Sequence, residues 1–106
     1  MSHPFSRSAR LLGPDAMNRL AGASAAVFGL GGVGSYVCEA LARGGIGRIV
    51  LIDGDTVDVT NINRQLIALH STVGLPKTEV MRRRLLDINP NLTVEAHQLF
   101  LSLIHI

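Results

Sequence analysis

Three short runs of apolar residues stand out along the chain, each bounded by small or polar residues. They cover residues 25–30, 48–53 and 92–96, and the last run can be extended to residue 100. The middle run is nearly uninterrupted, as Ile49-Val50-Leu51-Ile52. Continuous apolar runs of this length are typical of strands buried on both faces of a parallel sheet. The pattern predicts three strands.

Between the first two runs the apolar residues recur with a helical period instead. Gly44-Gly45 follows this segment where a left-handed cap ends a helix. The right-handed crossover rule places such a helix over the sheet. The positions that form its apolar stripe are Val33, Tyr36, Val37, Ala40 and Leu41.

A further helix is predicted over residues 78–88, with Met81, Leu85 and Ile88 as its apolar line and Asn89-Pro90 as its end. Residues 54–76 are expected to be mostly loop, with a short helix over residues 63–69. Residues 1–24 are expected to form an arm, with a helical turn at 7–12 and a helix at 16–20 capped by Asp15.

These elements predict an α/β fold that is Rossmann-like, with a mostly parallel sheet and only the first, nucleotide-binding half present. The expected division is an N-terminal helical arm over residues 1–24 and a truncated ATP-binding adenylation domain over residues 25–100. The last six residues, 101–106, read like the translation of a transposase adapter used in sequencing libraries. We expect them to be an artefact and the natural chain to be cut at about Phe100.

Composition excludes several classes of protein. A chain of 106 residues has room for one domain, and 47% hydrophobic residues with 17% charged residues exclude a disordered chain. The longest apolar stretch is broken by glycines, so no membrane span is expected. A single cysteine, Cys38, cannot form an internal disulfide, which agrees with a cytoplasmic location. Of the ten basic residues only Lys77 is a lysine.

The first strand runs directly into a glycine motif, Gly29-x-Gly31-x-x-Gly34. The first glycine permits a tight turn, the second lets the backbone approach a phosphate, and the third allows close helix–strand packing. The helix that follows offers free N–H groups to an anion. Asp53 ends the second strand 19 residues after Gly34, where an acid binds ribose hydroxyls. Together these features predict a nucleotide site.

A nicotinamide or flavin enzyme would satisfy the same features, so the segment after Asp53 has to separate the alternatives. A triphosphate carries more charge than a dinucleotide and recruits additional cations and a metal. The chain supplies Asn61, Arg64 and Gln65 in one polar loop, followed by Lys77. Asp55 is a candidate carboxylate on the Mg²⁺ side of the phosphates. This set favours ATP with Mg²⁺.

Four motifs carry a resemblance to a known family: Gly29-x-Gly31-Gly32-Val33-Gly34, Asp53-x-Asp55, Asn61-x-x-Arg64-Gln65 and Gly74-x-x-Lys77. With these motifs the chain resembles the adenylation domain of the ubiquitin-activating-enzyme-like superfamily from about residue 7 to residue 94. Within it, residues 39–47 and 60–65 are most similar to the dehydratases that act on threonylcarbamoyladenosine in tRNA.

The resemblance implies an α/β homodimer that uses Mg-ATP to adenylate a carboxylate and releases pyrophosphate. Carried over by position, Gly32 and its neighbouring glycines line the nucleotide, Asp53 holds the ribose, and Asn61, Arg64 and Lys77 hold phosphates. Arg10 corresponds to an arm arginine that reaches the ATP of the partner subunit. No residue of this chain is implied as a dedicated metal ligand. The family's metal-binding aspartate, cysteine loop and zinc cysteines would lie beyond residue 100.

Several reactive side chains receive a structural interpretation. An ionised carboxylate is already a nucleophile, so adenylation needs alignment and charge neutralisation more than a histidine base. His70 and His97 are therefore expected to be structural and Cys38 to serve packing. Two interpretations of the run from Arg82 to Arg84 stay open: a solvated helix face, or contact with tRNA phosphates.

Three functions remain as hypotheses. The first is the adenylating dehydratase that cyclises threonylcarbamoyladenosine in tRNA. The second is an adenylyltransferase that activates the C-terminus of a ubiquitin-like sulfur carrier, which would carry CxxC pairs in the missing half. The third is a dinucleotide-binding oxidoreductase, or a nucleotide-binding module with no chemistry of its own. The fragment alone is expected to be inactive, because half a doubly wound sheet exposes an apolar edge and face.

Overall fold

The computed structural model describes residues 14–100 of the chain. The helical turn predicted at residues 7–12 and the segment 101–106 lie outside this range. In chain order the elements are α2 (Pro14–Ala21), β1 (Ser24–Phe28), α3 (Gly32–Gly44), β2 (Arg48–Ile52), the 3₁₀ turn η1 (Val59–Asn61), α4 (Lys77–Ile88) and β3 (Thr93–His97).

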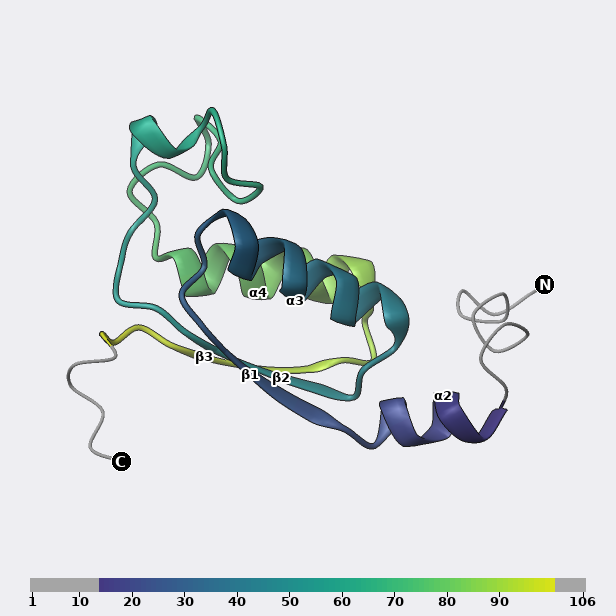
Figure 1. Ribbon diagram of the computed structural model, residues 1–106. Coiled ribbons are helices and arrows are strands. Elements are labelled where there is room, and N and C mark those ends of the chain that lie inside the picture. Colours follow the sequence, from purple (N-terminus) through teal and green to yellow (C-terminus); the bar gives the residue numbers. More distant parts are fainter. Residues whose placement is uncertain (1–13, 101–106) are drawn as a thin grey trace.

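The three strands form one parallel sheet in the order β1-β2-β3. Ala25 of β1 pairs with Ile49 of β2, which in turn pairs with Val94 of β3. Helices α3 and α4 lie side by side over one face of this sheet (Figure 1). The parallel α/β fold predicted from the sequence is confirmed, and the strand boundaries agree with the prediction to within two residues.

The core fills the space between the sheet and the two helices. Ile49 and Leu51 of β2 are fully buried beneath Cys38 of α3 and beneath Met81 and Leu85 of α4. The apolar line expected for α4 therefore faces the sheet. Buried aliphatic side chains contribute on the order of 1.5–3 kcal/mol each relative to exposure, so this cluster holds the two layers together.

The apolar stripe expected for α3 does not face the sheet, which corrects the sequence-based interpretation of this helix. Val33 is 81% exposed and Tyr36 is 62% exposed, whereas the small residues Ser35, Cys38 and Ala42 are buried. Small side chains let α3 approach the sheet closely, and close packing is favoured over burying the larger residues. Most of the apolar stripe is thus left on the outer surface of the helix, and only Leu41 of the five residues packs against the core.

The segment between β2 and α4 also differs from expectation. The helix predicted at residues 63–69 is absent from this part of the described chain, and the regular element is η1, closed by a capping box between Asp58 and Asn61. Backbone bonds from Val57 to Leu75 and from Gly74 to Val57 fasten the base of the loop. The side chains of Asp58 and Asn61 bond to the nearby backbone, and such local bonds favour a tight turn over a longer helix.

Helix α2 begins two residues earlier than predicted, at Pro14, so Asp15 lies inside the helix and not at the position before it. Proline is favoured at the first position of a helix because its missing N–H would have no partner there. The helix leads into β1 at one end of the sheet, away from the glycine turn (Figure 1).

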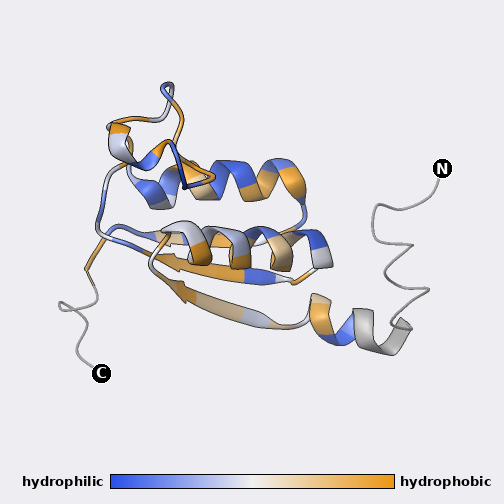
Figure 2. Cartoon of the chain, turned by 45° about the horizontal axis from the view of Figure 1, so that its top comes forward, coloured by the Kyte–Doolittle hydropathy of each residue, from blue (hydrophilic) through white to orange (hydrophobic). Residues whose placement is uncertain are grey.

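Within residues 14–100 the second face of the sheet has no covering layer, as Figure 2 shows. This face carries Phe28, Val50 and Ile52, and Phe28 is half exposed. Both outer strands also have an unpaired edge within the described chain. None of the helices described is long and apolar enough to cross a membrane.

Candidate nucleotide-binding site

The turn between β1 and α3 is built by glycines with three different roles. Gly29 has φ +88°, a conformation that side chains strongly disfavour. A Cβ on Gly34 would stand 1.9 Å from the carbonyl oxygen of Gly29, so only glycine allows the helix to start this close to the strand. The predicted turn and packing roles of these two glycines agree with this geometry.

Gly31 and Gly32 are not explained by contacts within the described chain. A Cβ on Gly31 would meet only the Gln65 amide nitrogen, at 4.0 Å, and a Cβ on Gly32 would lie 3.6 Å from the carbonyl oxygen of Arg64. The protein itself leaves room for a side chain at both positions. Glycines that are free of steric need, at the start of a helix, suit the close approach of an external anion to the backbone.

The N-terminus of α3 has no negative side chain that would compete with such an anion. Its N-cap residue, Gly31, makes no side-chain capping bond, and no acidic residue lies in the first turn. The start of α4 likewise lacks a side-chain cap. Because the strands are parallel, both helix N-termini lie at the same end of the sheet, next to the loop of residues 54–76 (Figure 1). Free N–H groups and the helix dipoles favour negative charge at this end.

Asp53 ends β2 directly beside the glycine turn. Its Oδ2 accepts a hydrogen bond from the Leu30 backbone N–H at 2.6 Å, and its Oδ1 accepts one from the Asp55 N–H at 2.7 Å. Each carboxylate oxygen retains a second lone pair for a further donor such as a ribose hydroxyl. The acid predicted to hold ribose therefore also fixes the turn.

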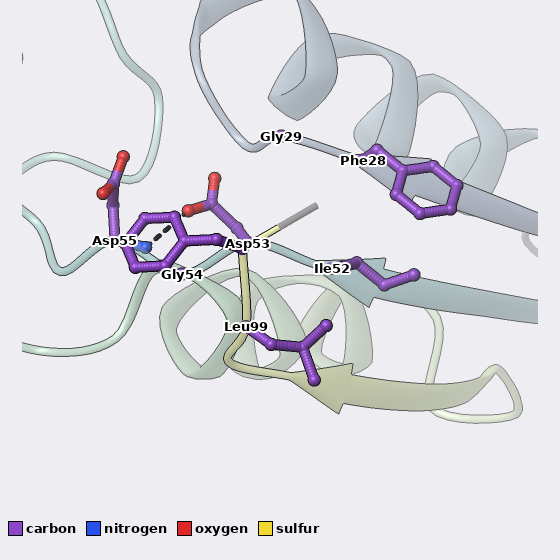
Figure 3. A pocket seen from close by; sticks show the side chains of 8 residues that line it. Phe28, Gly29, Ile52, Asp53, Gly54, Asp55 and Leu99 are labelled. Atoms are coloured by element: carbon purple, nitrogen blue, oxygen red, sulfur yellow. Dashed lines mark hydrogen bonds between the residues drawn. The ribbon is translucent and has the colours of Figure 1, made fainter. Parts of the chain in front are cut away.

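A cleft of about 260 Å³ opens at this end of the strands. Figure 3 shows the carboxylates of Asp53 and Asp55 rising on the same side of the chain, with Phe28, Ile52 and Leu99 at the apolar end of the cleft. The Phe100 ring lies directly on Gly54, where a Cβ would come within 2.6 Å of it. The cleft thus joins an apolar wall to a pair of acids, which suits a base and a ribose.

Lys77 is the first residue of α4 and is almost completely buried, with 6% of its surface exposed. Its backbone N–H binds the carbonyl oxygen of Asp55, which lines the cleft. Within residues 14–100 its ammonium group has no hydrogen bond and no ion pair, and the ammonium nitrogen is not one of the fully buried atoms that lack a partner, so it keeps contact with solvent. This cation is placed where an anionic ligand would neutralise it.

The structure places Arg64 differently. Its guanidinium is exposed and donates to the carbonyl oxygen of Thr60 at 2.8 Å and to the Asn63 side chain at 3.1 Å. It borders a second, open cleft of about 630 Å³ on the loop, together with His70. The backbone of Arg64, and not its guanidinium, lies against the glycine turn. In this structure, therefore, Lys77 is buried beside the nucleotide cleft, whereas the Arg64 side chain stays on the loop.

Asn61 is buried and its Oδ1 accepts a hydrogen bond from the Asp58 N–H, so its side chain organises η1. Hydrogen bonds from the backbone and side chain of Thr60 hold the pKa of the neighbouring Asp58 below its usual range, and the charge of Lys77 adds to this shift. The loop that was predicted to hold phosphates is thus rigidified by its own polar residues.

Gln65 was named in the polar loop but was given no role from the sequence. Its Oε1 is buried without a hydrogen-bond partner in the described chain, and its Nε2 faces Gly31. A buried acceptor left unpaired costs about 1–3 kcal/mol, so a donor from a ligand or an ordered water is needed there. The only sequence signal for Gln65 as a site residue was its place in the Asn61-x-x-Arg64-Gln65 motif.

Two further cations were predicted at the site: a Mg²⁺ ion bound with ATP, and Arg10 of the N-terminal arm. The described residues contain no group of three or more His, Cys, Asp or Glu side chains arranged to hold a metal ion. Mg²⁺ bound with ATP needs only one or two carboxylates, since phosphates and water supply its other ligands. The exposed carboxylate of Asp55 at the rim of the cleft fits that requirement. Arg10 lies outside the described residues.

The structural interpretation of Cys38 agrees with its surroundings. Burial raises the pKa of its thiol to about 11, so the thiolate that reacts is scarce at neutral pH. His97, on β3, lies 3.5 Å from Glu95, a carboxylate whose pKa is lowered chiefly by Arg48. His70 lies on the loop surface at the open cleft. None of the three lines the nucleotide cleft.

The parallel sheet, the glycine turn, the acid after β2 and the buried lysine define a nucleotide-binding α/β domain of Rossmann-like architecture. Comparison with known proteins identifies the particular group. The model of the ThiF family matches residues 5–103, and the chain belongs to this family.

Individual relatives are similar over most of this chain. The tRNA threonylcarbamoyladenosine dehydratase of Bacillus subtilis is 52% identical over 100 residues, which are 94% of this chain and 39% of that protein. A crystal structure of the Escherichia coli dehydratase in complex with ATP superposes with a TM-score of 0.89 at 52% identity, over 92% of this chain and 40% of that one. The sulfur carrier protein adenylyltransferase of Thermus thermophilus is 38% identical over 91 residues, 86% of this chain and 34% of that protein. The chain thus spans about two fifths of these relatives or less.

Proposed function

We propose that this chain is the nucleotide-binding part of an ATP-dependent adenylating enzyme that cyclises threonylcarbamoyladenosine in tRNA. The observation that carries the proposal is Lys77 at the start of α4: it is only 6% exposed, its backbone binds Asp55 of the cleft, and its ammonium has no ion pair within residues 14–100. Support also comes from the 52% identity to a dehydratase whose name states this substrate and to one crystallised with ATP. In this proposal the enzyme is a cytoplasmic homodimer.

The proposed roles follow the geometry of the site. The α3 backbone from Gly31 to Gly34 receives a phosphate, the Asp53 carboxylate accepts ribose hydroxyls with its free lone pairs, and Lys77 neutralises phosphate charge. Asp55 would hold Mg²⁺, which supplies charge neutralisation on the phosphates when bound. Arg64 turns from Thr60 toward the phosphates, and Arg10 of a second copy completes the cationic shell.

The proposed chemistry has two balanced steps. A substrate carboxylate oxygen attacks the α-phosphorus of ATP, and the bond to pyrophosphate breaks. An internal nucleophile of the substrate then attacks the acyl carbon, closes the ring, expels AMP together with the former carboxylate oxygen and releases its own proton to solvent, so that the substrate loses the elements of water. The groups of this chain contribute by aligning the reactants and by stabilising the charge that develops on the phosphates.

A pyrophosphate exchange assay on the full-length enzyme tests the proposal. Exchange of labelled pyrophosphate into ATP should require tRNA that carries threonylcarbamoyladenosine, and Lys77→Met and Arg64→Gln should each reduce it at least tenfold. Arg48→Gln is the matched control, because Arg48 pairs with Glu95 on the opposite face of the sheet. Normal exchange in both test variants would refute the assigned phosphate contacts.

The same assay separates the alternatives. Exchange that depends on a ubiquitin-like sulfur carrier and not on tRNA would favour the adenylyltransferase function, as in the Thermus thermophilus relative. Tight binding of NADH without competition from ATP would favour a dinucleotide oxidoreductase, which membership of the ThiF family does not favour.

A further inference from the structure

Two glutamates on the helical layer each hold two arginines. Glu39 of α3 accepts hydrogen bonds from Arg43, one turn further along the same helix, at 2.8 and 3.1 Å, and from Arg84 of α4 at 3.0 and 3.3 Å. Glu79 of α4 accepts bonds from Arg82 at 2.7 and 3.0 Å and from Arg83 at 3.0 Å. The pKa values of both glutamates are lowered, chiefly by the bonds from Arg84 and Arg82 respectively.

We propose that these four arginines, 43, 82, 83 and 84, form a docking surface for the phosphate backbone of the RNA substrate. This arginine surface rests on the proposed function, since it presumes that tRNA is the substrate. A guanidinium has five N–H donors in a planar fork, and the glutamates engage at most two on each arginine. The remaining donors are held in fixed directions and are free for phosphate oxygens.

The choice of residue supports a phosphate ligand. Arginine binds phosphate with two parallel hydrogen bonds, which lysine cannot do, and all four positions are arginine. The three ion pairs that lie within one helix contribute little to folding, because pairs of this spacing are worth only about 0.3–0.5 kcal/mol each. The arginine surface carries four positive charges, and the negative charges of Glu39, Glu79 and the exposed Asp87 cancel three of them. One net positive charge remains. The glutamates thus act as positioning residues for a cationic surface.

The position of the surface indicates a long ligand. Arg43 lies eleven residues after the start of α3 at Gly32, or about 16 Å along the helix axis at 1.5 Å per residue. That is beyond the reach of a triphosphate bound at the glycine turn. Arg84 bridges to α3 from the neighbouring helix, so the surface continues across both helices. An RNA that places its modified base at the cleft is large enough to contact this surface through its backbone.

Binding of tRNA by the full-length enzyme, measured by fluorescence anisotropy over a series of salt concentrations, tests the inference. The test variant is Arg43→Gln/Arg83→Gln, which changes the two most exposed arginines (61% and 65%) and leaves each glutamate one arginine partner. We expect tRNA affinity to fall about three- to tenfold and the slope of log Kd against log salt to decrease by about 0.7–0.9 per lost contact. ATP affinity should stay unchanged, and Arg48→Gln, which removes one positive charge on the far face where the test variant removes two, should bind tRNA normally.

The outcomes distinguish two kinds of failure. If the wild-type enzyme binds tRNA and the double variant binds it with the same affinity and salt slope, the arginine surface is not the docking site while the proposed function stands. If the wild-type enzyme does not bind tRNA, both the surface and the proposed substrate are refuted. A loss in the double variant that Arg48→Gln reproduces would show a general charge effect and would also overturn the inference.

Discussion

The carboxylate of Asp53 and the backbone N–H of Leu30 are joined by a 2.6 Å hydrogen bond that links the end of β2 to the glycine turn after β1. The acid that is expected to bind ribose is therefore also part of the framework that shapes the phosphate site. Because the second carboxylate oxygen holds the Asp55 N–H, one side chain organises both edges of the cleft.

Asp53→Asn should therefore affect folding as well as nucleotide binding. An amide offers one acceptor oxygen, so one of the two backbone N–H groups, on Leu30 or Asp55, loses its partner. We expect the free energy of unfolding to fall by about 1–3 kcal/mol and ATP affinity to fall as well. Chemical denaturation and ATP titration of the same samples measure both effects. An unchanged unfolding free energy would contradict the framework role.

Gly32→Ala and Gly34→Ala form a matched pair two residues apart. A methyl group at Gly34 would overlap the Gly29 carbonyl oxygen at 1.9 Å, so we expect a loss of stability of about 3 kcal/mol or more. At Gly32 there is room, and alanine favours the helix by up to about 1 kcal/mol. Gly32→Ala should therefore fold normally yet lose ATP affinity at least tenfold. If it binds ATP normally, no phosphate approaches the backbone at this position.

Lys77→Met should separate stability from function. The methionine side chain has a similar length and removes a charge that has no ion pair within residues 14–100 from a residue only 6% exposed, so the melting temperature should stay the same or rise. ATP affinity should fall at least tenfold, which corresponds to about 1.4 kcal/mol. Differential scanning fluorimetry with and without ATP reports both quantities. A marked fall in melting temperature without ATP would show that the ammonium is structural.

Glu79 gives the fold a defined acid sensitivity. Hydrogen bonds from Arg82, and secondarily from Arg83, lower the pKa of its carboxyl to about 2. A depressed folded-state pKa stabilises the fold above the ordinary value of 4.5, and this contribution is lost as the pH falls from 4.5 toward 2. Because the carboxyl is on the surface, we expect an effect of only about 0.5 kcal/mol. Urea unfolding of the wild type and Glu79→Gln should differ at pH 7 and converge near pH 2; a constant difference would contradict the ion pairs.

The strands, the glycine turn and α4 could be predicted because each is specified by residues close together in sequence. The continuous run around Val50 and the Gly29-x-Gly31-x-x-Gly34 spacing allow few alternatives. The buried face of α3 was misjudged because periodicity identifies an apolar stripe without showing what it packs against. In α3 the contact with the sheet is made by Ser35, Cys38 and Ala42, whose small size matters more than their hydrophobicity.

The candidate site was only partly accessible from sequence for a similar reason. Asp53 and Lys77 lie at element ends that the topology brings together, so their positions follow from the fold. The direction of the Arg64 guanidinium depends on a local bond to Thr60, and the burial of Gln65 Oε1 depends on how the loop folds back. Neither is encoded in residue spacing.

The Glu39–Arg84 contact limits how far the N-termini of α3 and α4 can move relative to each other. It fastens α3 to α4, and one of these helices begins at the glycine turn while the other begins at Lys77. The two helix N-termini that are proposed to bind the nucleotide are therefore held at a constant separation. Little conformational freedom is left to be lost when the nucleotide arrives.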